Sequence, residues 1–436
     1  MTEEAVFSVG IDDTDSPKGM CTTYVMFTFV NRAIKLLGAH VVGMPRLVRL
    51  NPACPWKTRG NASLGVDLAL KESQLERLRE VLVDTIFDLS EIDELETNPA
   101  FVVFRRSDID ERIRNYAREA VKRLVNPHVA AEIAKKKAVF SFGFNGWRGI
   151  VGAISGAAYD FPSGYTYELI AYRTKEYRGT PRRVLPESVF LADRALESCT
   201  FDNVDYENNE VKITPHTPCP VLLGIRGIDV ACLRKALDLL EIKEPVEGFI
   251  VYKTNQATDD HIIAVERIRD IEPLTSVSFK AEISDMPRAS AGGHVFVYVT
   301  DGENKIRVAA YEPTRGLRHV LLSLRPGDII RVWGSYKPRE GEPPTINLEK
   351  IEVIKIGPYG RLVNPICPVC GTRMKSEGKG KGYECPRCKF RTKDASKILE
   401  LERRELIPGI YDVPPKARRH LSRPSFLNVI KDEGKD

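Results

Sequence analysis

The 436-residue sequence lacks the features of a membrane or exported protein. No apolar run approaches the roughly 20 residues that are needed to span a bilayer. The N-terminus, MTEEAVFSVG, is acidic and short, which does not fit a signal peptide. No internal repeat is visible, and the length suggests roughly two to four domains. We therefore expect a cytoplasmic protein with no membrane partner.

A strong charge imbalance is also missing. The chain has 65 lysines and arginines against 60 aspartates and glutamates, which gives a net charge of +5. This excess is too small to establish nucleic-acid binding by itself. The local clustering of basic residues therefore has to decide whether the chain binds a nucleic acid.

The nine cysteines do not form the regularly spaced set of a disulfide framework. Five of them are scattered along the chain: Cys21, Cys54, Cys199, Cys219 and Cys232. In a cytoplasmic protein, an odd and scattered remainder of this kind predicts free thiols.

The other four cysteines form two C-x-x-C pairs separated by 14 residues: Cys367, Cys370, Cys385 and Cys388. Such pairs offer four thiolates to one tetrahedral zinc ion at about 2.3 Å. Four thiolates leave no open coordination position, so the site is structural. Four reduced cysteines without a metal would leave about 30 residues without a core. The spacing therefore predicts a zinc ribbon.

Residues 9–24, VGIDDTDSPKGMCTTY, place three carboxylates on one turn. The letters before the turn predict a buried strand, and those after it predict a helix that ends at Gly38. Asp12, Asp13 and Asp15 repel one another unless a cation compensates them. Mg²⁺ takes one or two carboxylates together with water and phosphate oxygens, which suits Asp12 and Asp15. A surface capping loop is the alternative.

The rest of this turn has the chemistry of a phosphate-binding loop, because it brings N–H groups, an amine and hydroxyls to a helix N-terminus. A Walker A motif, GxxxxGK[ST], is absent. A second loop, PWKTRGN, adds further phosphate-binding groups. The residues expected to bind ATP are Ser16, Lys18, Gly19, Met20, Cys21, Lys57, Arg59 and Asn61.

Thr22 stands at the predicted start of the helix that follows the acidic turn. A hydroxyl group beside a metal-bound nucleotide can accept a phosphoryl group. A threonine in this place is equally common as a helix N-cap. The residue pattern leaves both interpretations open.

Residues 274–358 predict five short strands with one helical piece before the fourth, an arrangement that fits an OB-fold better than a sandwich. Basic residues alternate with aromatic residues there, as in folds that stack single-stranded bases beside a basic groove. The aromatic residues would alternatively only fill the barrel. The residues expected to bind tRNA are Arg307, Arg318, Trp333 and Lys337.

Four carboxylates in the middle of the chain are candidates for binding a cationic substrate: Asp160, Glu168, Asp259 and Asp260. Each of them equally fits a solvated surface group or a structural ion pair. His216 is expected to be structural rather than catalytic.

Several motifs in matching order resemble the archaeal tRNA-isoleucine agmatinylcytidine synthetases. They are GIDDTDSPKGMCTTY, RLNPACPWKTRGN, YELIAYR with PRRV, HTPCPVLLGIRG and TNQATDDH, followed by the OB-like region and the four-cysteine ribbon. The resemblance covers residues 8–395. One departure is Trp147 in the glycine-rich stretch FNGWRGIVGA, which leaves the role of that stretch open. The tail beyond residue 396 matches nothing in the family.

The resemblance implies an ATP-dependent ligase. The family joins agmatine to carbon 2 of the wobble cytidine in the isoleucine tRNA with the anticodon CAU, so that the tRNA reads AUA. An unusual kinase domain activates the cytosine by phosphorylation, and ATP is consumed to AMP. The family's phosphorylated threonine falls on Thr22, and its metal- and nucleotide-binding aspartates fall on Asp12, Asp13 and Asp15. Agmatine is dicationic, and Glu168 and Asp160 are the carboxylates we expect to bind it.

The expected architecture is a multidomain α+β protein. We expect an N-terminal α/β kinase-like domain, a ferredoxin-like domain, an OB-fold β-barrel, a C-terminal zinc ribbon and a tail. Their expected ranges are 1–126, 127–270, 271–358, 362–395 and 396–436. The tail predicts a short helix and an extended segment.

Two other classes of function remain open on the residues alone. A non-catalytic protein that binds tRNA or single-stranded RNA would use the OB and ribbon modules. It does not explain the acidic turn, which RNA phosphates would repel without a metal. A small-molecule kinase would use the N-terminal region, but it leaves the OB and ribbon modules unexplained.

Overall fold

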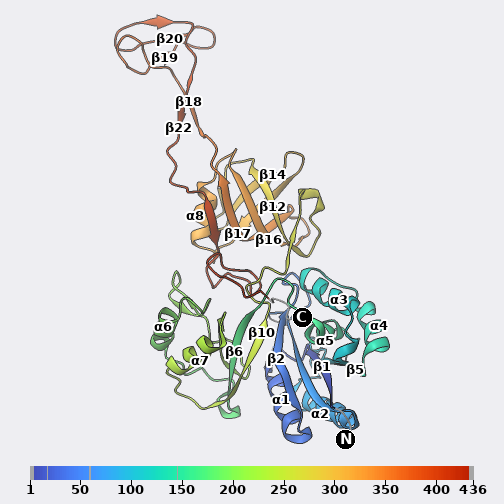
Figure 1. Ribbon diagram of the computed structural model, residues 1–436. Coiled ribbons are helices and arrows are strands. Elements are labelled where there is room, and N and C mark those ends of the chain that lie inside the picture. The colour runs from blue at the N-terminus through green and yellow to red at the C-terminus, as the bar shows by residue number, and fades with distance from the viewer. Residues whose placement is uncertain (1–3, 17, 58–59, 145, 432–436) are drawn as a thin grey trace.

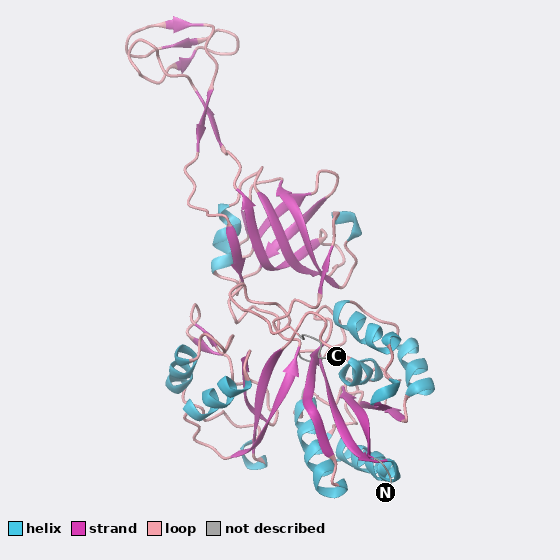
Figure 2. Cartoon of the chain, in the orientation of Figure 1, coloured by secondary structure: helices cyan, strands magenta, loops and turns pink. Residues whose placement is uncertain are grey.

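The computed structural model of the chain describes residues 4–16, 18–57, 60–144 and 146–431. Two large β-sheets dominate it (Figures 1 and 2). One is an open sheet flanked by helices, and the other is curled into a barrel. A narrow two-stranded neck then carries a small ribbon module away from the barrel.

The open sheet has eight strands in the order β5-β4-β1-β3-β2-β10-β6-β9. Their bounds are β1 Glu4–Asp12, β2 His40–Arg49, β3 Ala62–Lys71, β4 Ala100–Arg105, β5 Phe140–Gly143, β6 Thr166–Arg173, β9 Val221–Gly227 and β10 Val246–Thr254. Neighbours run antiparallel except β2 and β10, which pair in parallel through Arg46–Lys253 and Leu47–Thr254. This parallel pair joins an N-terminal half to a middle half of the chain.

Helices cover both faces of the N-terminal half (Figure 1). Helices α1 (Thr22–Leu37) and α2 (Leu75–Leu89) pack on one face. On the other face lie α3 (Glu111–Lys122), α4 (Pro127–Lys137) and α5 (Ile150–Ala158). The predicted strand, turn and helix over residues 5–38 are confirmed, including the left-handed Gly38 at the end of α1.

Helix α5 accounts for the glycine-rich stretch whose role was left open. A Cβ atom added to Gly10 or Gly65 would lie 1.8 Å from a carbonyl oxygen of this helix. Gly156 likewise approaches the backbone of β3, where a Cβ would lie 2.2 Å from the Leu64 oxygen. Glycines on both surfaces therefore let the helix backbone lie directly on the sheet. The buried Arg46 donates to the carbonyls of Gly156 and Ala157 at the end of the helix.

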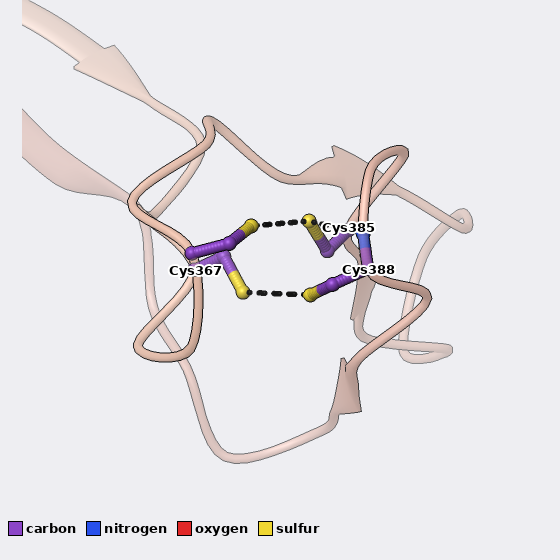
Figure 3. Close-up of side chains that lie close together, drawn as sticks. Cys367, Cys385 and Cys388 are labelled. Atoms are coloured by element: carbon purple, nitrogen blue, oxygen red, sulfur yellow. Dashed lines mark hydrogen bonds between the residues drawn. The ribbon is translucent and has the colours of Figure 1, made fainter.

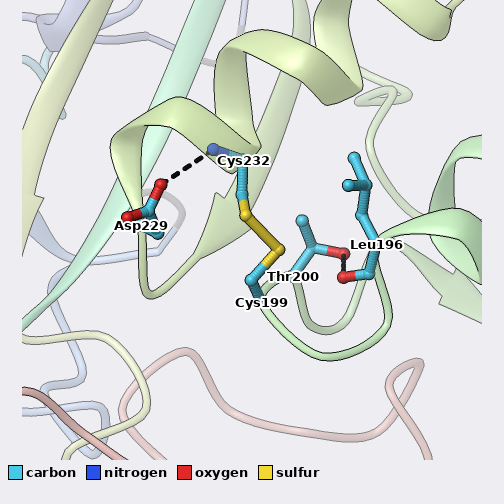
Figure 4. Close-up of a disulfide and its surroundings, with 5 residues drawn as sticks. All are labelled: Leu196, Cys199, Thr200, Asp229 and Cys232. Atoms are coloured by element: carbon cyan, nitrogen blue, oxygen red, sulfur yellow. Dashed lines mark hydrogen bonds between the residues drawn. A yellow bond between two sulfur atoms is a disulfide. The ribbon is translucent and has the colours of Figure 1, made fainter.

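In the middle half, α6 (Pro186–Ala195) and α7 (Val230–Leu239) pack on β6 and β9. A short hairpin of β7 (Val204–Asp205) and β8 (Glu210–Val211) lies beside them. The prediction of free thiols is wrong for two cysteines, because Cys199 and Cys232 form a disulfide (Figure 4). The fold brings the turn after α6 within 6.3 Å of the first turn of α7, measured between Cα atoms. Cys21, Cys54 and Cys219 are free, as predicted.

The predicted OB-fold is confirmed as a barrel. Its strands are β12 Thr275–Ile283, β14 Val295–Thr300, β15 Lys305–Ala310, β16 Ile329–Tyr336 and β17 Thr345–Lys355, with β11 Ile262–Ala264 and β13 Arg288–Ala289 at its edges. Pairing of β12 with β14 closes it. The predicted helical piece is α8 (Gly316–Ser323), between β15 and β16.

Strands β18 (Gly360–Val363) and β22 (Ile398–Leu401) form the neck, and the ribbon itself holds β19 (Lys375–Ser376), β20 (Tyr383–Glu384) and β21 (Arg391–Thr392). Two of the apolar side chains of the neck, Leu362 and Leu399, are more than half exposed. Within the described residues, no helix combines the length and apolar character that crossing a membrane requires.

The C-terminal segment differs from its prediction of a short helix and a tail. Up to the last described residue it contains strands only, because β23 (Gly409–Asp412) adds to the barrel along β17. The chain then runs back to the open sheet, where backbone N–H groups of Ala257 and Tyr165 donate to the carbonyls of His420 and Ile430. The segment thus lies between the barrel and the open sheet.

Candidate functional site

A cavity of about 470 Å³ lies where the acidic turn, the start of α1, the loop between β2 and β3, the start of α5 and the C-terminal segment meet. Strands β6 and β9 of the middle half line another side of it, so both halves of the open sheet contribute. Its acidic lining residues are Asp12, Asp13, Asp15 and Glu168. Its basic ones are Arg49, Lys57, Arg123, Arg148, Lys212 and Arg226.

The carboxylates of Asp12 and Asp13 are buried at the end of β1. Burial raises the pKa of Asp12 well above its ordinary value, and the neighbouring Asp13 raises it further. Burial also raises the pKa of Asp13 to about 6, although Arg148 opposes this shift from 3.6 Å. Gly152 on α5 makes room for this group, because a Cβ there would lie 1.7 Å from Oδ2 of Asp12. A divalent cation is the natural compensation for such repulsion.

Helix α1 points its N-terminus at the cavity. Cys21 is the N-cap by its extended backbone but makes no capping hydrogen bond with its side chain. Thr22 is the first helical residue, so it does not act as the N-cap, and it lines the cavity together with Thr23. Burial raises the pKa of Cys21 to about 11, which keeps its thiol protonated. The hydroxyl group of Thr22 therefore lies next to the aspartates at the positive end of a helix dipole.

The loop between Asp15 and α1 is held from outside the cavity. The Ser16 hydroxyl donates to Glu91, and the Lys18 amine pairs with Glu94. Four residues predicted to bind ATP do not line the cavity in this conformation: Ser16, Lys18, Gly19 and Met20. The side chain of Lys18 is 70% exposed. The loop thus presents Asp15 and Cys21 to the cavity, and it keeps its lysine outside.

The second predicted loop contributes Lys57 and Asn61 to the cavity wall. The Asn61 side chain donates to the carbonyl of Asn51 at 2.8 Å, which closes the loop at its base. Burial lowers the pKa of Lys57, and Arg419 lowers it further. Arg59 lies outside the described residues.

The two carboxylates expected to bind agmatine lie in different places. Glu168 on β6 lines the cavity, where its oxygens lie 3.5 Å from the Arg49 guanidinium and 3.6 Å from that of Arg226. Asp160 does not line the cavity, and Arg118 on α3 binds its carboxylate through two nitrogens. The structure therefore brings only Glu168 to the cavity.

The remaining candidates of the middle region have structural partners. Asp259 accepts from the Lys350 amine at 2.7 Å, and Asp260 accepts from the Tyr159 hydroxyl at 2.5 Å. His216 lies at the cavity with an 82% exposed side chain. We find no partner for the first two that points to a substrate.

Three kinds of cavity residue escaped the sequence analysis. Arg49 and Arg226 stand at a strand end and inside a strand, where an isolated arginine gives no signal. Arg148 directly precedes α5. His420 comes from the C-terminal segment, where the run Arg418-Arg419-His420 was the only available signal.

The residues predicted to bind tRNA are spread over the barrel. The Arg307 guanidinium lies 4.7 Å from the Phe296 ring centre, and Arg318 donates to the Gly293 carbonyl. Trp333 is half-buried. Burial lowers the pKa of Lys337, and the charges of Arg419 and Lys57 lower it further, which places this lysine on the cavity side of the barrel.

The four predicted zinc ligands come together in the ribbon (Figure 3). Their sulfur atoms all lie within 4.8 Å of one another, as four ligands around one ion require. Across the site, the sulfurs of Cys367 and Cys388 are 3.5 Å apart, and those of Cys370 and Cys385 are 3.4 Å apart. Elsewhere in the described part of the chain, no three such ligand atoms gather this closely.

Four family models match the chain in order. The TiaS TCKD domain matches residues 8–74, and the TiaS FLD domain matches residues 148–261. An OB-fold nucleic acid binding domain matches residues 277–354, and the TiaS C-terminal zinc ribbon domain matches residues 364–406.

Relatives and solved structures match over nearly the whole length. The 2-agmatinylcytidine synthetase TiaS of Archaeoglobus fulgidus, named for the second isoleucine tRNA, is 40% identical over 422 residues, which is 97% of each chain. A crystal structure of TiaS in complex with that tRNA and ATP aligns with a TM-score of 0.88, at 38% identity over 98% of both chains. A complex of TiaS with the tRNA, AMPCPP and agmatine aligns with a TM-score of 0.84, at 35% identity over 96% of both chains.

Proposed function

This chain belongs to the TiaS family of tRNA-isoleucine 2-agmatinylcytidine synthetases, and from that premise we propose that it joins agmatine to carbon 2 of the wobble cytidine in the CAU-anticodon isoleucine tRNA. It is an ATP-dependent ligase that forms a C–N bond, and the product lets the tRNA read AUA. Because its substrate is tRNA, we propose that it works in the cytoplasm.

One observation carries the proposal: carboxylates, a hydroxyl group and a basic wall share one cavity. Asp12 and Asp15 line it beside Thr22, and Lys57 faces them from the second loop. Phosphoryl transfer depends chiefly on positioning and charge neutralisation, and this arrangement provides both. Thr22 is not used as a helix cap, so its hydroxyl is available as the phosphoryl acceptor.

Magnesium fits the acidic wall. Mg²⁺ at nucleotide sites takes one or two carboxylates and completes its shell with water and phosphate oxygens. We assign Asp12 and Asp15 as its ligands and Asp13 to the nucleotide. When bound, the ion neutralises the charge of the transferring phosphates.

The nucleotide's phosphates would lie between the N-terminus of α1 and the second loop. There the helix dipole, Lys57 and Asn61 all favour negative charge. We place Cys21 beside them as a neutral neighbour.

The cytosine oxygen on carbon 2 is a poor leaving group, and its phosphorylation makes phosphate the leaving group instead. An amine can then add to the carbon. The base must leave the anticodon stack, which costs little in a loop whose bases are already partly unstacked. Of the two carboxylates expected for agmatine, we retain Glu168, and a guanidinium there requires Arg49 or Arg226 to turn toward the phosphates.

The experiment is a mass-spectrometric assay of the wobble nucleoside after incubation with the tRNA, agmatine and ATP. We expect the agmatine-joined nucleoside from the wild type and none from Asp12→Ala. Thr22→Ala should lose phosphate incorporation from γ-labelled ATP, because it lacks the acceptor oxygen. Thr200→Ala, on a buried turn of the middle half, is the matched control and should keep the label. ATP turnover without any modified nucleoside would refute the proposal.

A further inference from the structure

The C-terminal segment is built into three parts of the molecule. Beyond β23, Arg418 pairs with Asp202 of the middle half. Arg419 donates to the Ser335 hydroxyl of the barrel at 2.9 Å and lies 3.0 Å from Glu349. The backbone of His420 accepts from Ala257 at 2.8 Å. The segment therefore holds a fixed path along the wall of the cavity.

The side chain that this path brings to the cavity is His420. Its ring lines the cavity next to Gly60, where an added Cβ would lie 3.2 Å from Nε2. Nδ1 is buried, and no group among the described residues bonds to it. A histidine that only held the fold would be expected to use its ring nitrogens for hydrogen bonds. The C-terminal segment thus presents an imidazole whose Nδ1 makes no structural bond within the described part of the chain.

We propose that His420 is a catalytic residue that accepts the proton lost by agmatine when its amine attacks carbon 2. This step rests on the proposed function. The neutral amine forms the N–C2 bond with its lone pair. The C2–O bond then breaks, and the phosphate leaves with the bonding electrons. The surplus amine proton passes to His420 and from it to the departing phosphate, so the ring returns to its neutral form.

The charges around the ring suit this task. Burial lowers the pKa of His420 well below its ordinary value, and Arg49 on β2, Arg226 on β9 and Lys57 on the second loop lower it further. The ring is therefore neutral and able to accept a proton. A phosphate on the bound cytosine neutralises these three cations. The basicity of the ring thus rises when the activated base is in place.

The test compares the wild type, His420→Ala and His420→Gln in two assays. The first measures phosphate incorporation from γ-labelled ATP, which does not need this proton transfer. The second measures the agmatine-joined nucleoside. Loss of a general base costs about 100-fold or more. We expect that loss in the second assay for both variants, with the label retained within about twofold. Added imidazole should restore part of the activity of His420→Ala but not of His420→Gln, whose side chain fills the space. His40→Ala, exposed at the start of β2, is the control.

Three outcomes separate the alternatives. Wild-type rates of joining in His420→Ala overturn the inference. Equal loss in both assays without any response to imidazole also overturns it, because this would show only that the C-terminal segment supports the fold. A wild type that forms no agmatine-joined nucleoside overturns the proposed function instead, before His420 is tested.

Discussion

Replacing Asp13 by asparagine should stabilise the ligand-free enzyme at neutral pH while it impairs catalysis. Burial holds the pKa of Asp13 at about 6, against an ordinary value of 3.8. The native state therefore keeps this proton at pH values where the unfolded chain has lost it. Between these two values the native state binds more protons, so stability falls as the pH rises. Asparagine tolerates the positive φ of 56° at this position.

The size of the effect follows from the shift. A rise from 3.8 to about 6 corresponds to about 3 kcal/mol of destabilisation at pH 7.5, at 1.36 kcal/mol for each pKa unit. The variant recovers only part of this, because the contact with Arg148 at 3.6 Å is weakened. We expect a net gain of about 1–2 kcal/mol, which in a domain of this size is roughly 2–4 °C for each kcal/mol.

The assay is thermal unfolding at pH 7.5 and pH 4.5. Asp84→Asn, on the exposed face of α2, is the matched control and should change little at either pH. Asp13→Asn should melt higher than the wild type at pH 7.5 and nearly equal to it at pH 4.5, where the wild-type carboxyl group is already protonated. Magnesium with a non-hydrolysable ATP analogue should stabilise the wild type more than the variant. A gain that is the same at both pH values, or no gain at all, would refute the role assigned to buried charge.

Two further predictions concern packing and the ribbon. Gly152→Ala should abolish product formation, because its Cβ would lie 1.7 Å from Oδ2 of Asp12 and displace that carboxylate, whereas Gly179→Ala, which has open space around it, should not; comparable product from both variants would contradict this explanation. Cys385→Ser, or zinc removal by a chelator, should unfold the ribbon and weaken tRNA binding while γ-phosphate incorporation continues, as metal analysis and tRNA titration can check; unchanged tRNA affinity would remove the ribbon from the binding surface.

The local elements of the N-terminal region could be predicted from the sequence. The strand, acidic turn and helix over residues 5–38 each have a clear periodicity or an end signal, so neighbouring residues determine them. The cysteine spacing likewise predicts the ribbon, because four ligands of one ion must come together. The five domain boundaries stay a prediction.

Contacts between distant segments could not be predicted in this way. The letters of helix α5 resemble a glycine-rich loop, and only the close approach of Gly10 and Gly65 makes its glycines favourable. The disulfide between Cys199 and Cys232 depends on how α6 and α7 pack. His420 belongs to the cavity because the chain returns from the barrel, and no local pattern records that return.

The most direct measurement is a crystal structure with magnesium, a non-hydrolysable ATP analogue and the tRNA. The account predicts a metal on Asp12 and Asp15, with the terminal phosphate of the analogue facing the Thr22 hydroxyl. A nucleotide bound elsewhere, with no metal at the acidic turn, would contradict it.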